Sequence, residues 1–191
     1  MKNKFRLIQT IAFFIALFMV VSCDKDFIEE PVDTTGVTDA LIFSSRENAQ
    51  TFVNGILANY KGQYRGVDAG GLYAMYFARA VKGNDIIQDF SFYTFDYGHE
   101  NREPNYRRTN FTWDFNYENI NFANTLIAGI NNSDGLGDVE KREFIAKGKF
   151  FRGFHLFELA LEFAPNYNND RSIERIPLYI SPTSLETVGG N

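Results

Sequence analysis

The sequence predicts a mostly α-helical fold, in which tetratricopeptide-like helical hairpins carry long irregular loops. Three stretches place apolar residues at steps of three and four, the period of one helix face. The last two stretches flank a turn-forming segment at 131–138, so they are expected to pair as a hairpin. The consensus spacing of the tetratricopeptide repeat is not met, and no second copy is visible, so only the architecture is predicted.

The composition is that of a globular protein and excludes several functions. With 191 residues, of which 45% are hydrophobic, the chain can enclose a real core. One Cys excludes a disulfide framework and any multi-cysteine metal site, and two His leave little material for a histidine-based metal centre. The net charge of −5 argues against a nucleic-acid partner. No metal and no cofactor are expected.

Residues 1–22 are expected to be a signal peptide. Three basic residues precede an unbroken apolar run at 11–21, which is too short to cross a bilayer and fits the apolar core of an export signal. A buried core helix is the alternative.

The only cysteine, Cys23, follows this run in the order Val20-Val21-Ser22-Cys23. The pattern resembles a lipobox, in which the leader is removed and the cysteine becomes a lipid-modified amino terminus. An ordinary signal peptide with an incidental cysteine is the alternative. Several acyl chains would hold the protein firmly on a membrane, because a single chain binds only marginally. We therefore expect lipidation at Cys23.

Residues 23–43 are expected to be an acidic tether. Up to residue 40 the segment carries six acidic residues and one lysine. Such a segment favours an extended, solvated spacer between membrane and domain. A sharper interpretation is a sorting signal, because acidic residues after a lipidated cysteine resemble the surface-export signal of Bacteroidetes lipoproteins.

The folded domain is expected to span residues 44–191 and to begin with a helix at 46–61. Ser44 and Glu47 fit a capping box at its start, and Gly62 can end it. A glycine-rich loop at 62–71 and a shorter helix at 72–81 follow. Residues 83–111 have weak periodicity and are predicted to be a long irregular segment, a kind of segment that is usually functional or mobile.

Two longer helices follow. Thr112 is expected to cap the first of them, and Asp138 is expected to cap the second, at 139–163. The apolar residues of 139–163 lie almost all round the helix, which predicts burial on most sides. Pro165 ends it.

Several of these segments resemble the SusD/RagB family. Residues 113–124, W-D-F-N-Y-E-N-I-N-F-A-N, are similar to that family's W-x-x-x-Y-x-x-I-x-x-A-N signature. Residues 148–159, G-K-F-F-R-G-F-H-L-F-E-L, resemble its A-K-F-L-R-A-x-x-x-F-D-L helix, and Ile176-Pro177-Leu178 resembles its I-P-L segment. Asn84-Asp85-Ile86-Ile87 is similar to its G-D-D-V-type segment. Gly148 and Gly153 depart from the pattern, which usually has Ala; each weakens the helix by roughly 0.5–1 kcal/mol or allows close helix packing.

The resemblance implies a lipoprotein of the Bacteroidetes outer membrane, facing the cell exterior. Family members bind oligosaccharides or other nutrients, pass them to a TonB-dependent SusC-like transporter, and are not enzymes. They are several hundred residues long, so the resemblance implies that this chain is the amino-terminal part of a SusD-like fold, incomplete at its carboxy-terminal end. A helical protein-interaction module at the outer membrane, with no ligand of its own, is the alternative function.

Sugar binding needs flat aromatic faces and polar groups for hydroxyls, and the 83–111 segment supplies both. The residues that we predict to contact ligand are Phe92, Tyr93, Tyr97, Asn101, Tyr106 and Arg107. Core packing is the alternative for each of them, and it is favoured for Trp113 because that residue lies in a helical stripe.

The sequence supports a catalytic function less well than it supports ligand binding. Asp85 with Asp89, and Glu158 with Glu162, are carboxylate pairs at helical spacing, but glycoside hydrolysis needs carboxylates on opposite sides of a bond. Solvated helix-face charges are the preferred interpretation. His155 is expected to be a packed core residue, and Arg152 is expected to form a buried ion pair.

Overall fold

The computed structural model describes residues 38–62, 69–83, 85–89, 91–100, 103–174 and 176–183, all within one compact unit. The predicted signal peptide, Cys23, residues 23–37 of the predicted tether, and Asn101 lie outside these ranges. In the described ranges the regular elements are helices, which confirms the mostly α-helical fold. None of those helices carries an apolar stretch that could cross a bilayer.

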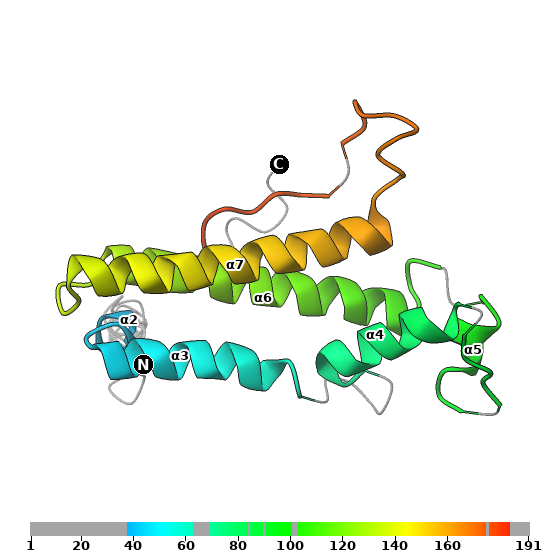
Figure 1. The fold of residues 1–191 in the computed structure, drawn as a ribbon, viewed down its shortest axis with the longest axis horizontal. Coiled ribbons are helices and arrows are strands. Elements are labelled where there is room, and N and C mark those ends of the chain that lie inside the picture. Colours follow the sequence, from blue (N-terminus) through cyan, green and yellow to red (C-terminus); the bar gives the residue numbers. More distant parts are fainter. Residues whose placement is uncertain are drawn as a thin grey trace, which may run out of the picture. The chain divides into compact units, whose positions relative to one another are not determined.

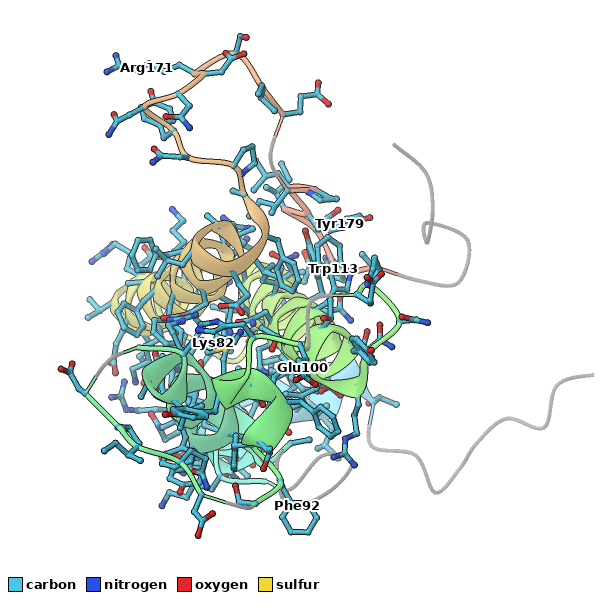
Figure 2. The ribbon with its side chains drawn as sticks, turned by 90° about the vertical axis from the view of Figure 1, so that its right-hand side faces the viewer. Lys82, Phe92, Glu100, Trp113, Arg171 and Tyr179 are labelled. Atoms are coloured by element: carbon cyan, nitrogen blue, oxygen red, sulfur yellow. The ribbon has the colours of Figure 1, made fainter. Side chains whose placement is uncertain are left out.

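Two long helices dominate the fold. They are α6 (Arg107–Asn131) and α7 (Asp138–Phe163), which pack along each other as the predicted hairpin (Figure 1). The shorter helices are α2 (Asp39–Ile42), α3 (Arg46–Asn59), α4 (Gly71–Val81) and α5 (Thr94–Tyr97). Seen end on, α6 and α7 lie side by side with α3 and α4 beneath them (Figure 2). The irregular segments on either side of α5 lie within the stretch 83–111 that was expected to be irregular.

The main core lies where α3 packs against the hairpin. Its buried side chains come from α3, α6 and α7, and include Val53, Leu126 and Phe144. The helices of the hairpin approach closely at Gly148, because a Cβ there would lie 2.6 Å from Cγ1 of Ile127 on α6. Of the two roles open to Gly148, close helix packing is therefore the one that the structure supports.

A buried polar network crosses this core at His155. The hydroxyl of Tyr60 donates to Nε2 at 2.8 Å, and Nδ1–H donates to Oδ1 of Asn116 at 2.8 Å. Burial lowers the pKa of His155 to about 3, so the ring is neutral and each nitrogen has one partner. The expectation that His155 is a packed core residue is confirmed.

Three predicted helix caps are wrong. Ser45, not Ser44, caps α3, because its side chain accepts a hydrogen bond from the Asn48 amide. Thr112 is buried inside α6, which begins at Arg107, six residues before the start that a cap at Thr112 would give. Asp138 is the first residue of α7. Gly137 is the N-cap, and its amide donates a hydrogen bond to the Glu140 carboxylate.

The end of the predicted tether also belongs to the folded unit. Residues 39–42 form α2, and the Phe43 side chain is only 2% exposed. A Cβ at Gly129 would overlap the Phe43 ring, so that glycine makes room for it on α6. The boundary at residue 43 is therefore too late, because an aromatic side chain buried in a core cannot be part of a solvated spacer.

The prediction that 139–163 is buried on most sides is wrong. Phe144, Phe151 and Leu159 are buried on one face of α7. Phe150, Phe157 and Leu161 lie on the other side and are 68%, 59% and 55% exposed. The described residues cover only one face, although apolar residues occur on both.

Candidate functional site

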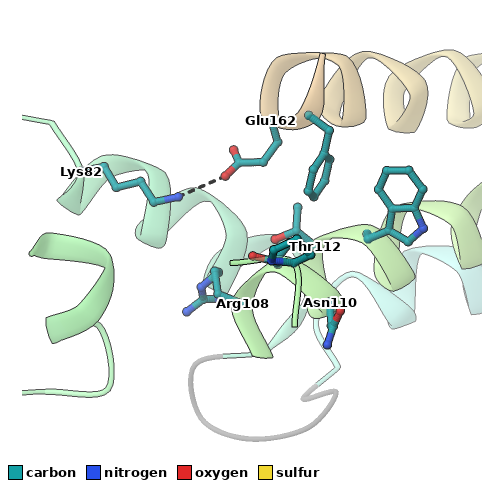
Figure 3. Close-up of a pocket in the computed structure, with 9 residues that line it drawn as sticks. Lys82, Arg108, Asn110, Thr112 and Glu162 are labelled. Carbon is teal, nitrogen blue, oxygen red and sulfur yellow. Dashed lines mark hydrogen bonds and ion pairs between the residues drawn. The ribbon is translucent and has the colours of Figure 1, made fainter. Parts of the chain in front are cut away.

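A pocket of about 630 Å³ opens where the end of α4, the start of α6 and the end of α7 meet. Figure 3 shows Lys82 reaching across it to Glu162 of α7, with Asn110 and Thr112 contributed by α6. Trp113 and Phe163 supply its aromatic wall. The site therefore combines flat apolar surface with hydrogen-bonding groups.

Trp113 is the central aromatic residue of this region. Its ring lies 4.8 Å from that of Tyr117 and meets Phe163 edge on at 5.1 Å. The side chain is 36% exposed and also borders a second pocket of about 210 Å³, lined by Tyr117, Asn121 and Tyr179 among others. The preference for core packing at Trp113 is wrong, because part of its surface faces two pockets.

The charges around the larger pocket neutralise one another. Nζ of Lys82 lies 3.1 Å from Oε1 of Glu162, and Nε of Arg79 lies 3.5 Å from Oε2 of the same carboxylate. Arg108 is buried beside Asp96, with 3.3 Å between Nε and the carboxylate. A neutral ligand with many hydroxyl groups suits such a site better than a strongly charged one.

The carboxylates that sequence inspection singled out on α7 are ion-paired. Glu158 is only 4% exposed; it accepts hydrogen bonds from Arg79 at 2.9 Å and from the Tyr76 hydroxyl at 3.1 Å. The interpretation of Glu158 as a solvated surface charge is therefore wrong. Asp85 and Asp89 are exposed, as expected for solvated charges.

The segment 177–183 is held against α6 and α7 by side chains that bind its backbone. Asn124 donates to the carbonyls of Tyr179 and Ser181 at 3.1 and 3.0 Å, and Arg152 donates to that of Ile180 at 3.1 Å. The hydroxyl of Tyr117 donates to the carbonyl of Pro177 at 2.9 Å, and burial raises its pKa to about 12. The three segments 113–124, 148–159 and 176–178 thus meet in space.

Among the residues that the structure describes, Arg152 does not have the acidic partner that we expected. Its Nη1 donates to Oδ1 of Asn124 at 3.0 Å and to the Ile180 carbonyl. Both acceptors are neutral, so the described part of the chain does not contain the buried ion pair predicted for Arg152. The guanidinium links α7 to α6 and to the segment 177–183.

The six residues predicted to contact ligand do not converge. Phe92 is 61% exposed and lies on the side of the molecule away from Trp113 and Tyr179 (Figure 2). Tyr97, Tyr106 and Arg107 are exposed, and Asn101 lies outside the described residues. Tyr93 is 6% exposed and packs with Ala78 and Val81, so its ring is a core contact in this structure. None of the five described residues lines either pocket beside Trp113.

Sequence inspection missed the pocket because its walls are distant in the chain. Lys82, Trp113 and Phe163 come from three different helices or helix ends. The available signal was the pair Trp113 and Tyr117, two large aromatic residues at helical spacing within the stretch similar to SusD/RagB proteins.

Comparison with known proteins supports the fold assignment. No family model matches the sequence, and no curated protein matches it. The structure is similar to the crystal structure of a SusD-like carbohydrate binding protein from Bacteroides vulgatus ATCC 8482, with a TM-score of 0.67 and 19% sequence identity. The match covers 78% of this chain and 31% of that chain, so the chain spans about a third of the solved protein's length. The expected likeness to the SusD fold is confirmed.

Proposed function

We propose that this chain binds an oligosaccharide at the outer-membrane surface and delivers it to a TonB-dependent SusC-like transporter. The observation that carries the proposal is the partly exposed Trp113 between two pockets with polar walls. The fold shared with a solved carbohydrate binding protein supports the same class of ligand.

The chemistry of the pocket suits a neutral sugar. One face of a pyranose ring is apolar and packs against an aromatic side chain, while its hydroxyls need donors and acceptors at the edge. Trp113 and Phe163 supply the aromatic surface, and Thr109 and Asn110 supply polar groups. The ion pair of Lys82 with Glu162 leaves no net charge there to attract an ionic ligand.

Binding is tested with a panel of neutral oligosaccharides derived from starch, plant cell walls and host glycans, using isothermal titration calorimetry. We expect at least one class to bind and Trp113→Ala to weaken it by about tenfold or more, equivalent to about 1.4 kcal/mol. Phe92→Ala is the matched control, because Phe92 is an exposed aromatic residue far from the pocket.

Absence of binding across the panel, with the helical circular dichroism spectrum intact, would contradict glycan binding. Loss of binding in Phe92→Ala but not in Trp113→Ala would move the site to the 91–107 segment. Because the role proposed is binding without cleavage, chromatography should recover the bound oligosaccharide unchanged.

Delivery to a transporter and export to the cell surface are supported by the sequence alone. The predicted lipobox at Cys23 and the acidic residues after it fit a lipid-anchored protein that faces the exterior. Affinity purification from outer membranes should recover a SusC-like transporter encoded beside this chain's gene. Its absence after mild detergent extraction would count against the delivery role.

The alternative function is a helical interaction module that binds no ligand of its own. The exposed apolar residues of α7 favour it, because exposed aromatic side chains are enriched at protein interfaces. The glycan panel separates the two functions: a transporter that co-purifies with a protein binding no glycan would favour the interaction module.

A further inference from the structure

Four aromatic side chains, hereafter the aromatic row, join the two pockets beside Trp113. The ring centroids of Phe163 and Trp113 lie 5.1 Å apart, and those of Trp113 and Tyr117 lie 4.8 Å apart. Tyr179 continues the row at 5.6 Å from Tyr117. Phe163 lines the larger pocket, Trp113 lines both, and the two tyrosines line the smaller one. The aromatic row therefore runs from one pocket into the other.

Every ring of the aromatic row keeps part of its surface exposed. Trp113 is 36% exposed, and the other three side chains are half-buried. Neighbouring rings meet at angles between 52° and 85°, so none of them is hidden within a face-to-face stack. Apolar surface is thus available along the whole row.

Two rings of the aromatic row are held in place by hydrogen bonds within the chain. The Tyr117 hydroxyl donates to the Pro177 carbonyl at 2.9 Å, and the Tyr179 carbonyl accepts from Asn124 at 3.1 Å. Asn124 is 1% exposed and accepts in turn from Arg152 at 3.0 Å. A surface that is ordered in advance loses less free energy on binding than one that the ligand must order.

The smaller pocket has the size of an extension rather than of a separate site. Its volume is about 210 Å³, below the range of about 300–1,000 Å³ that is typical of ligand pockets. The larger pocket, at about 630 Å³, lies within that range. The described residues that line the smaller pocket are all uncharged. It therefore suits a neutral sugar unit at one end of a ligand that begins in the larger pocket.

Polar groups accompany the aromatic row in both pockets. In the larger pocket Lys82 donates to Glu162 at 3.1 Å, which places donor and acceptor groups side by side, as neighbouring sugar hydroxyls require. In the smaller pocket Oδ1 of Asn121 accepts from the amide and hydroxyl of Thr183 at 2.8 and 3.1 Å. The amide nitrogen of Asn121 can then donate to a ligand hydroxyl.

We infer that the aromatic row is one binding platform with the smaller pocket as its end subsite, so that this protein selects neutral trisaccharides and longer oligosaccharides over shorter ones. The inference rests on the glycan binding proposed above and adds the length of the ligand. Successive sugar units pack on successive rings from Phe163 to Tyr179, because each unit offers its own apolar face. A monosaccharide covers one part of the row and leaves the rest in water.

Calorimetry with ligands of increasing length tests the inference in the full chain. The probes are malto-, cello- and xylo-oligosaccharides and oligomers of N-acetyllactosamine. In a series that binds, the trisaccharide should bind at least about tenfold tighter than the disaccharide. Tyr179→Ala should abolish that gain and leave the disaccharide affinity unchanged. Tyr73→Ala is the matched control, because Tyr73 also packs on one aromatic ring, that of Phe77 at 5.7 Å, but lines neither pocket.

The fluorescence of Trp113 gives a second readout that needs no substitution, because Trp113 is the only tryptophan. A trisaccharide should shield it from acrylamide quenching at a concentration at least about tenfold lower than a disaccharide. Equal affinities for the two lengths, or an undiminished gain in Tyr179→Ala, would overturn the inference and leave glycan binding at Trp113 in place. Absence of binding by every series would overturn both this inference and the proposed function.

Discussion

Arg152 of α7 donates a hydrogen bond to Oδ1 of Asn124 of α6 at 3.0 Å, and both side chains also donate to the backbone of residues 179–181. Asn124 is 1% exposed. The pair therefore joins the hairpin to the segment 177–183, which forms part of the wall of the smaller pocket beside Trp113.

Replacing Arg152 should loosen this junction. Arg152→Ala leaves the buried Oδ1 of Asn124 without its donor, so we expect the free energy of unfolding to fall by about 1–3 kcal/mol. Urea denaturation of this variant and of Arg171→Ala measures the effect. Arg171 is an exposed arginine in the loop after α7, and its guanidinium lies over the Tyr167 ring, so its removal should change stability by less than about 0.5 kcal/mol. Equal losses in the two variants would contradict the role given to Arg152.

His155 should make the fold sensitive to acid. Burial lowers its pKa from 6.5 to about 3, so between these values the unfolded chain binds a proton that the folded chain does not. The contribution of His155 to the free energy of unfolding is fully present above pH 6.5. It decreases by a few kcal/mol as the pH drops toward about 3. Protonation would also remove the lone pair that accepts from Tyr60.

The variant His155→Gln isolates this contribution, because an amide can donate and accept but does not titrate. Its stability should depend less steeply on pH between 6 and 4 than that of the parent chain. Acidic groups titrate in both proteins. One of them is Glu143, and hydrogen bonds from Arg46 and Lys147 lower its pKa to about 2. Identical pH slopes would contradict the buried neutral state of His155.

The two glycines of α7 should respond oppositely to the same change. Gly148→Ala places a Cβ 2.6 Å from Ile127 Cγ1, so overpacking should cost about 1–3 kcal/mol. Gly153→Ala meets no atom within 4 Å, so the better helix propensity of alanine should stabilise the fold by about 0.5–1 kcal/mol. Thermal unfolding of both variants decides the matter, and stabilisation by Gly148→Ala would contradict the close approach of α6 and α7.

Cys23 should determine membrane attachment. Replacing it with alanine removes the thiol that would carry lipid, so the protein should leave the membrane fraction and lose labelling by a radioactive fatty acid. Fractionation followed by immunoblotting measures this, with Ser22→Ala as a control because alanine is equally small before the cysteine. Unchanged membrane association of Cys23→Ala would contradict the predicted anchor.

Periodicity predicted the helices well and their ends less well. The stripes at 46–61 and 139–163 correspond to α3 and α7, because the apolar period is a local property that survives in the fold. The cap at Ser44 failed because Ser45, the next residue, can bond the same first amides, and the cap at Thr112 failed because α6 begins earlier, at Arg107, with no side-chain cap. At α3 local hydrogen bonds distinguish the two serines: Ser45 accepts from the Asn48 amide, while Ser44 donates to the Leu41 carbonyl three residues before it.

The candidate site was not predictable in the same way. A patch of aromatic and polar residues at 92–107 has a suitable composition, yet Tyr93 packs in the core and Phe92 points away from Trp113. The pocket instead takes Lys82 from the end of α4, five residues from the start of α6, and Glu162 and Phe163 from the end of α7. Composition cannot locate such a site, because no local pattern records which helix ends meet.

The sequence by itself determined the helical class, the hairpin across 131–138, the likeness to SusD-type proteins and the candidate anchor at Cys23. These depend on residue order within short stretches. Only the tertiary structure decided that Trp113 borders pockets, that Arg152 holds neutral partners, and that Gly148 is covered while Gly153 is open. The reason is that exposure and hydrogen-bond partners depend on which helices pack together. Two glycines five positions apart on one helix therefore have opposite surroundings.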